Sequence, residues 1–110
     1  MFKGGDIPPG PVHLLVLQDE RVYCVNPLDP ERNRLLDAGA AAQNIVLTAH
    51  ALGLGGVWLT FTPPVFERLH DFLKLREHYK LITYVDVSWP AQNPAPLLRL
   101  ELAEALLKRV

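Results

Sequence analysis

Apolar side chains gather along the chain in blocks separated by turn-forming residues, and the blocks are of two kinds. Some are short, nearly continuous apolar runs, which are typical of buried strands. Others repeat apolar residues every three or four positions, which is typical of helices. The predicted strands are residues 12–17, 55–61 and 81–89, with 21–25 as either a further strand or an irregular return. The predicted helices are residues 30 to about 52, 63 to about 75, and 103–108.

The first helix has clear start and stop signals. The Asp29 side chain can accept hydrogen bonds from the open amides of the first turn, and Pro30 suits the first helical position. Gly53 follows the last periodic residue and predicts the stop. Thr62 and Pro63 give the second helix a start of the same kind.

The first helix is small or apolar on more than one side. One stripe, with spacings of three and four, comprises Leu35, Ala38, Ala42, Ile45, Ala49 and Leu52. Further apolar positions that widen this stripe are Ala41, Val46, Leu47 and Ala51. Because a surface helix is apolar on one side only, we expect this helix to be buried on more than one side.

The third predicted strand is interrupted by two polar residues, Asp86 and Ser88. We therefore expect one of its ends to approach an edge of the sheet or a site. The proline-rich residues 90–96 that follow predict a loop.

Composition fits one globular domain, since the chain has 110 residues, of which 49% are apolar and 21% charged. Residues 1–11 are rich in glycine and proline and are expected to form an N-terminal arm, with the domain at 12–110. A net charge of −1 with scattered basic residues gives no footprint for nucleic acid. The lone cysteine, Cys24, excludes an intrachain disulfide and fits a reducing compartment. With no signal peptide and no apolar run near the roughly 20 residues that span a bilayer, we expect a cytoplasmic protein without membrane contact.

The sequence lacks the residue patterns of several common catalytic and metal sites. The sole serine, Ser88, has no Gly-x-Ser-x-Gly around it, and Cys24 lies in an apolar stretch, so neither is expected to act as a nucleophile. His70, Asp71 and His78 match no zinc-ligand spacing, and no metal site is predicted.

The glycines at 53, 55 and 56 do not predict a dinucleotide-binding loop. Such a loop follows a strand and opens a helix, whereas these glycines follow a helix and precede a strand. They are interpreted as a helix cap and a tight turn. His50, just before them, is expected to be a partly buried helix residue with a hydrogen-bond partner rather than a catalytic group.

The stretch DAGAAAQNIVLTAHALGLG at residues 37–55, soon followed by VWL, resembles the C-terminal half of the nitroreductase family of flavin enzymes. The upstream GPVHLLVL resembles the family's central strand, and LKLREHYKLITYVDVSWP resembles its stretch ending in Gly-Tyr-Pro. NPAPLLRLELAEAL resembles the family's basic C-terminal segment. Together these stretches span about residues 11–107.

The resemblance implies an α+β fold in which helices flank a central, mostly antiparallel sheet. It also implies an intertwined homodimer with FMN at the interface, and NAD(P)H-dependent reduction of nitro compounds, quinones or similar acceptors. In such enzymes the flavin carries the redox chemistry, and the protein binds and orients it. The long alanine-rich helix would pack against its symmetry mate, because a two-fold dimer requires a self-complementary patch.

By family position, Trp58, Leu59, Thr60 and Phe61 would form the segment that contacts the flavin, with a backbone N–H near the flavin N5. Arg99 falls where the family has a basic residue on the FMN phosphate, and guanidinium donors match phosphate oxygens. No catalytic side chain is assigned. The family usually has a glycine at or next to positions 60 and 61, so Thr60 and Phe61 predict either a blocked substrate side or a changed backbone angle.

Family members normally also carry an N-terminal half with an Arg-x-Ser-x-Arg segment that grips the FMN phosphate, and residues 1–11 do not resemble it. Three hypotheses remain open. The chain is an FMN-dependent oxidoreductase, or it is a truncated, non-catalytic domain that dimerises or completes a partner chain. The third is an α+β domain unrelated to flavin, since most alanine-rich helices are simply well packed.

Overall fold

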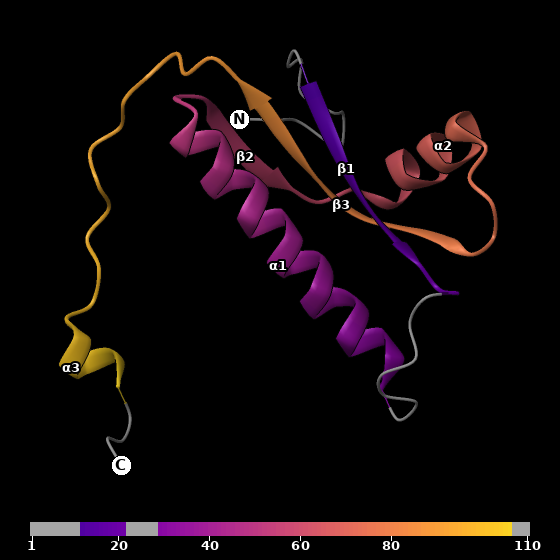
Figure 1. The fold of residues 1–110 in the computed structure, drawn as a ribbon, viewed down its shortest axis with the longest axis horizontal. Coiled ribbons are helices and arrows are strands. Elements are labelled where there is room, and N and C mark those ends of the chain that lie inside the picture. Colours follow the sequence, from indigo (N-terminus) through magenta and orange to yellow (C-terminus); the bar gives the residue numbers. More distant parts are fainter. Residues whose placement is uncertain (1–11, 22–28, 107–110) are drawn as a thin grey trace.

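A computed structural model describes residues 12–21 and 29–106, and within these residues three strands form one antiparallel sheet (Figure 1). The elements in chain order are β1 (Val12–Asp19), α1 (Pro30–Ala51), β2 (Gly55–Leu59), α2 (Pro63–Leu73), β3 (Tyr79–Ser88) and α3 (Leu102–Ala105). The strand order is β1-β3-β2, so the last strand of the chain lies in the centre of the described sheet.

The hydropathy pattern located these elements to within a few residues. Outside the described residues lie the predicted N-terminal arm (1–11), positions 22–25 of the possible further strand, and positions 107–108 of the last predicted helix. We expected one end of β3 to approach an edge of the sheet or a site. The edge is excluded within the described sheet, because Val87 pairs with Val12 on one side and Gly56 on the other. Asp86 is accommodated in a central strand because it lies opposite His13, on the sheet face turned away from α1.

The predicted ends of α1 are confirmed. The Asp29 side chain accepts a hydrogen bond from the Arg32 N–H at 3.1 Å. At the other end Gly53 adopts φ +76, and its N–H donates to the His50 carbonyl at 3.0 Å. A side chain at this left-handed position would be strained, which explains the glycine.

The core lies between one side of α1 and the sheet. Its buried apolar members are Val16, Ala38, Ala42, Ala49, Val85 and Val87. Single methyl groups on α1 let the helix backbone come close to the strands. Gly56 in β2 lies so close to α1 that a Cβ added to it would be in van der Waals contact with the helix backbone, 3.6 Å from the Val46 Cα. Close approach is therefore a property of small residues on both surfaces.

The opposite side of α1 is uncovered by the described residues of its own chain. It carries Leu36 and Leu47, each more than half exposed. Leu35 and Leu52 lie near the two ends of the stripe predicted to be buried, and there they too are more than half exposed. Burial of α1 on more than one side is thus not achieved within the described part of a single chain, which leaves an apolar side available to a partner.

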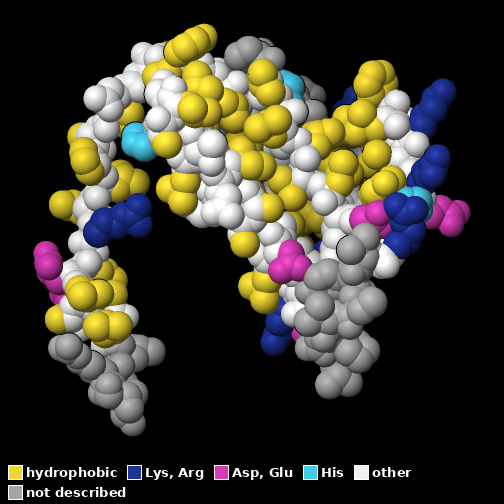
Figure 2. Space-filling model, viewed as in Figure 1, with side chains coloured by type: hydrophobic (Ala, Val, Ile, Leu, Met, Phe, Trp, Pro, Cys, Tyr) yellow, Lys and Arg dark blue, Asp and Glu magenta, His cyan; other side chains and the backbone are white. Residues whose placement is uncertain are grey.

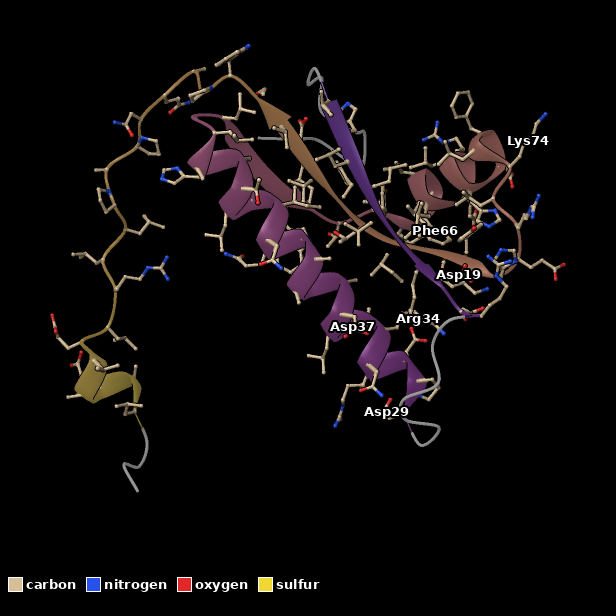
Figure 3. The ribbon with its side chains drawn as sticks, viewed as in Figure 1. Asp19, Asp29, Arg34, Asp37, Phe66 and Lys74 are labelled. Atoms are coloured by element: carbon tan, nitrogen blue, oxygen red, sulfur yellow. The ribbon has the colours of Figure 1, made fainter. Side chains whose placement is uncertain are left out.

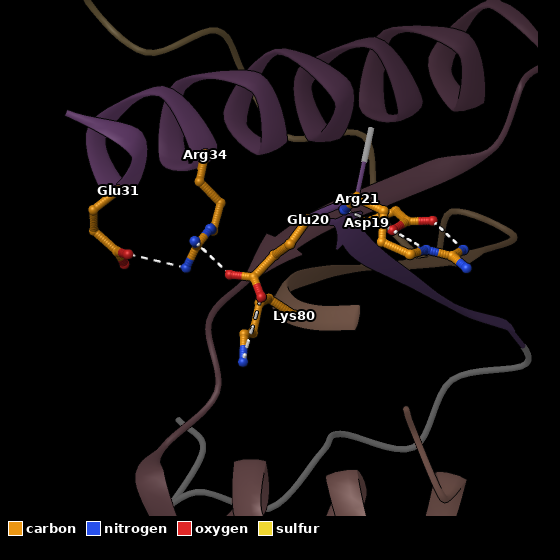
Figure 4. Close-up of polar contacts among 6 residues, drawn as sticks. All are labelled: Asp19, Glu20, Arg21, Glu31, Arg34 and Lys80. Atoms are coloured by element: carbon orange, nitrogen blue, oxygen red, sulfur yellow. Dashed lines mark hydrogen bonds and ion pairs between the residues drawn. The ribbon is translucent and has the colours of Figure 1, made fainter. Parts of the chain in front are cut away.

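The start of α1 is joined to the sheet by a chain of ion pairs (Figure 4). The Arg34 guanidinium donates to Glu31 at 3.0 Å and to Glu20, just after β1, at 2.7 Å. Lys80, near the start of β3, lies 3.7 Å from the same Glu20 carboxylate. Arg34 in α1 points toward the end of β1, where Asp19 lies (Figure 3). These contacts fix the register of helix and strands at this end of the molecule.

The second helix, α2, packs more loosely. Thr62 precedes it as predicted, but its side chain makes no capping hydrogen bond. None of the side chains of α2 is buried, and Phe66 stacks on His70 with ring centroids 6.3 Å apart. The helix ends at Lys74, labelled in Figure 3, which adopts φ +50.

Residues 89–106, the C-terminal segment, run clear of the body and end in the short α3 (Figure 1). Its apolar side chains are largely exposed, and Figure 2 shows apolar groups all along it. The most exposed are Trp89, Leu97, Leu98, Leu100 and Leu102. A reciprocal capping box joins Glu101 and Glu104, but four residues are far too few for a helix that is stable in water by itself. The described part of one chain therefore leaves the apolar side chains of this segment uncovered.

Among the described helices, none has the length and apolarity needed to cross a bilayer.

The close approach of α1 to the sheet can be tested by overfilling it. Ala42 has no exposed surface, so Ala42→Leu should lower the free energy of unfolding by roughly 1–3 kcal/mol, measured by urea denaturation. The neighbouring Ala41 is exposed on the same helix, and Ala41→Leu should cost clearly less. Equal stability of the Ala42→Leu variant and the wild type would show that this contact is not tight.

Candidate functional site

Four of the five predicted site residues lie where the chain leaves the sheet. Trp58 and Leu59 are the last residues of β2, and Thr60 and Phe61 lead on toward α2. We refer to these four residues as the 58–61 segment. The ladder between β2 and β3 ends at the pair Leu59–Tyr84, so the conformation of the next residues must be set by other contacts.

One such contact comes from β3 on the side that faces α1. The Thr83 hydroxyl accepts a hydrogen bond from Trp58 Nε1 at 2.8 Å and donates one to the Leu59 carbonyl. The Trp58 indole lies against α1, where a Cβ added at Gly39 would be 3.4 Å from the ring. Trp58 is thus turned toward the helix and remains about half exposed.

A second contact lies on the opposite face of the sheet. The Phe61 ring stacks on Tyr84, with centroids 4.7 Å apart and planes 28° apart. The Tyr84 ring meets His13 edge-on, and His13 Nδ1 lies 3.4 Å from an Asp86 carboxylate oxygen. Burial raises the pKa of the Tyr84 phenol, and the nearby Asp86 charge raises it further.

The backbone of the 58–61 segment is unstrained and offers donors. Among the described non-glycine residues, only Lys74 has a positive φ, so Thr60 and Phe61 need no glycine conformation. The changed backbone angle considered from the sequence is therefore not required. Within the described part of the chain, no acceptor lies within hydrogen-bond reach of the N–H of Thr60 or of Phe61.

Arg99 lies on the C-terminal segment, away from the other four residues. This segment leaves from the end of β3, where Ser88 pairs with Gly55 at the start of β2, and the 58–61 segment lies at the other end of that strand (Figure 1). Among the described residues no acidic side chain pairs with Arg99. One chain therefore does not bring its own Arg99 to its own 58–61 segment.

The other candidate residues give no alternative centre. His50 is exposed on the wall of a cleft of about 750 Å³ between the end of α1 and residues 90–94, so the expectation of a partly buried histidine was wrong. It is exposed because it lies on a different side of the last turn from the buried Ala49. In the described ranges, 12–21 and 29–106, no three metal-ligating side chains come close enough to hold an ion.

Known proteins resemble this chain over most of its length. Residues 6–87 match the model of the Nitroreductase family. The chain belongs to the nitroreductase family. The hypothesis of an α+β domain unrelated to flavin thereby loses its basis, because it took the alanine-rich helix for a generic packed helix. The family resemblance drawn from the alanine-rich helix and the glycine turn is confirmed.

Individual relatives agree with this assignment. A "Putative NADH dehydrogenase/NAD(P)H nitroreductase" of Methanothermobacter thermautotrophicus is 39% identical over 61 residues, which are 53% of this chain and 31% of that protein. A crystal structure from Desulfovibrio desulfuricans, a "putative nitroreductase in complex with FMN", is 35% identical with a TM-score of 0.65. The match covers 88% of this chain and 54% of that one. A nitroreductase family protein from Clostridium difficile 630 has a TM-score of 0.70 at 21% identity, which supports the fold alone, and the match covers 88% of this chain and 58% of that one.

The predicted nitroreductase-like α+β fold, with an antiparallel sheet and flanking helices, is confirmed by these structures. The chain spans about a third of the curated relative and a little over half of the two solved structures.

The 58–61 segment suits the edge of a flavin ring system. It offers two N–H donors beside flat aromatic side chains, which are the groups that an isoalloxazine edge can accept from and lie against. It does not offer a cation for the phosphate, because Arg99 lies elsewhere in the same chain. An FMN bound at this segment would need its phosphate held by residues outside the segment.

The stacking of Phe61 on Tyr84 makes a testable prediction about titration. Phe61→Ala should hydrate the Tyr84 phenol and lower its raised pKa toward the ordinary tyrosine value, measured by tyrosinate absorbance with Tyr84→Phe to assign the signal. In the wild type the folded state holds the phenol neutral, so stability should be lost as the pH rises from the ordinary tyrosine value through the raised one. The control Phe72→Ala changes an exposed ring and should leave this titration unaltered. A Tyr84 pKa unaffected by Phe61→Ala would contradict the stack.

Proposed function

We propose that this protein is an FMN-binding, NAD(P)H-dependent oxidoreductase that acts as a homodimer and reduces nitro compounds, quinones or similar acceptors in the cytoplasm. Family membership supports the reaction class. The names of its relatives support FMN and NAD(P)H, since one was solved with FMN and another is called an NAD(P)H nitroreductase. A single cysteine in 110 residues supports a reducing compartment.

The observation that carries the proposal is the pair of N–H groups at Thr60 and Phe61, without acceptors among the described residues, at the end of β2. We expect these donors to face the flavin edge near N5, with Trp58 and Leu59 forming the rest of the contact. FMN, when bound, supplies the hydride-accepting and hydride-donating centre. The chain's own residues orient the ring and exclude water from one of its sides.

A homodimer is supported by two apolar surfaces that the described part of one chain leaves uncovered. The first is the outer side of α1, with exposed Leu36 and Leu47, and the second is the C-terminal segment. A two-fold arrangement of α1 against α1 would bury the first. The C-terminal segment of one copy could then carry Arg99 to the other copy's cofactor, so that a complete phosphate contact forms only in the dimer.

The second candidate is a non-catalytic nitroreductase-like domain that dimerises or completes a partner chain. The separation of Arg99 from the 58–61 segment favours it, because no described cation of the same chain stands ready for the phosphate. This candidate requires a stable dimer or hetero-complex whose melting temperature does not respond to FMN.

Titration of the purified protein with FMN separates the two candidates. Under the proposed function, saturating FMN raises the melting temperature, and anaerobic NADH or NADPH bleaches the bound flavin. An unchanged melting temperature at high micromolar FMN, with a colourless protein, would rule out the oxidoreductase.

The role of Arg99 can be tested within the same titration. Arg99→Ala should weaken FMN binding by roughly 10- to 150-fold, which corresponds to losing one charge-assisted contact of about 1.5–3 kcal/mol. Arg76, exposed in the turn before β3, provides the matched control, and Arg76→Ala should leave the dissociation constant unchanged. Equal FMN affinities of the two variants would show that Arg99 does not contact the cofactor.

A further inference from the structure

Thr83 is a buried hydroxyl in the central strand, with 3% of its surface exposed. It stands in β3 among apolar residues that face α1, where a hydroxyl without partners would cost free energy. Its hydroxyl accepts a hydrogen bond from the Trp58 indole N–H and donates one to the Leu59 carbonyl. Both partners belong to the 58–61 segment.

The position of these bonds matters because β2 ends there. The last ladder pair is Leu59–Tyr84. Thr83 comes just before Tyr84 in the chain, and because the strands are antiparallel it lies just beyond this last pair. Its side chain holds the Leu59 carbonyl beyond the point where backbone pairing stops. A fixed carbonyl fixes the plane of the peptide that follows, which contains the N–H of Thr60.

Tyr84, the neighbour of Thr83 in β3, acts from the opposite face of the sheet by stacking on Phe61. Two consecutive residues of β3 therefore contact the 58–61 segment, Thr83 from the face toward α1 and Tyr84 from the opposite face. On the α1 side the same contact holds the Trp58 indole over Gly39, which has no side chain to displace it.

We propose that Thr83 is a positioning residue, which sets the direction of the Thr60 and Phe61 N–H groups before the flavin binds. This inference rests on the proposed function, since it names how the cofactor segment is preorganised. Preorganised donors need no reordering when the ligand arrives, and this raises affinity and stabilises the charge that develops on the bound ring.

The test compares Thr83→Val, which removes both hydrogen bonds at nearly constant shape, with Thr83→Ser, which keeps the hydroxyl. Thr83→Val should weaken FMN binding by about 2- to 13-fold, the equivalent of one hydrogen bond of roughly 0.5–1.5 kcal/mol, and shift the absorption band of the bound flavin. In the protein without flavin it should also increase the backbone mobility of Thr60 and Phe61, measured by ¹⁵N NMR order parameters. Thr83→Ser should restore wild-type values in all three measurements.

Val87→Ala separates positioning from stability. Val87 is buried on the same side of β3 and pairs with Gly56, and its truncation destabilises the fold without removing a side-chain hydrogen bond. It should leave the flavin absorption band and the order parameters of Thr60 and Phe61 unaltered. A Thr83→Val variant that matches Val87→Ala in these readouts overturns the inference and leaves Thr83 a structural residue.

Two further outcomes remain decisive. Should Thr83→Val fail to fold, Thr83→Cys replaces the hydroxyl by a weak donor, and wild-type affinity and order parameters in that variant would overturn the inference. Should the wild type not bind FMN, the proposed function fails, and the order parameters alone decide about Thr83. Unchanged order parameters at Thr60 and Phe61 in the Thr83 variant would then refute the positioning role as well.

Discussion

The close contact between the alanines of α1 and the central strand β3 is the constraint on which the rest of the structure depends. Ala42 and Val85 have no exposed surface, and the helix lies across all three described strands. Only small side chains permit this distance. The ion pairs from Arg34 to Glu20 and Glu31 fix one end of the helix, and the glycine turn at Gly53 fixes the other, so that β2 enters the sheet in register.

From this contact follows the geometry of the candidate site. Because β3 is central, its two faces look toward α1 and away from it, and consecutive residues can act on opposite faces. Thr83 and Tyr84 use this alternation to hold the 58–61 segment on both sides. The site is thus a consequence of strand order, with its donors delivered at the point where β2 stops pairing.

Much of this arrangement could be predicted from the sequence. The helix from Pro30 was predictable because Asp29 and Gly53 are strong local signals, and the family was predictable from the alanine-rich helix with its glycine turn. The central position of β3 was not, because Asp86 is compensated by His13 from a strand more than 70 residues earlier in the chain. Thr83 was missed for the same reason, since its partners lie 24 and 25 residues away and only folding brings them together. A threonine between apolar residues of β3 was the available signal.

In the proposed homodimer, α1 packs with one side on β3 and with the other on a second copy, and the flavin is held where the copies meet. Sedimentation velocity, recorded at both a protein and a flavin wavelength, tests this arrangement directly. For this arrangement we expect a single boundary at twice the 12.3 kDa chain mass, with flavin absorbance travelling in it. A flavin-bearing boundary at the mass of one chain, or a dimer boundary without flavin, would contradict it.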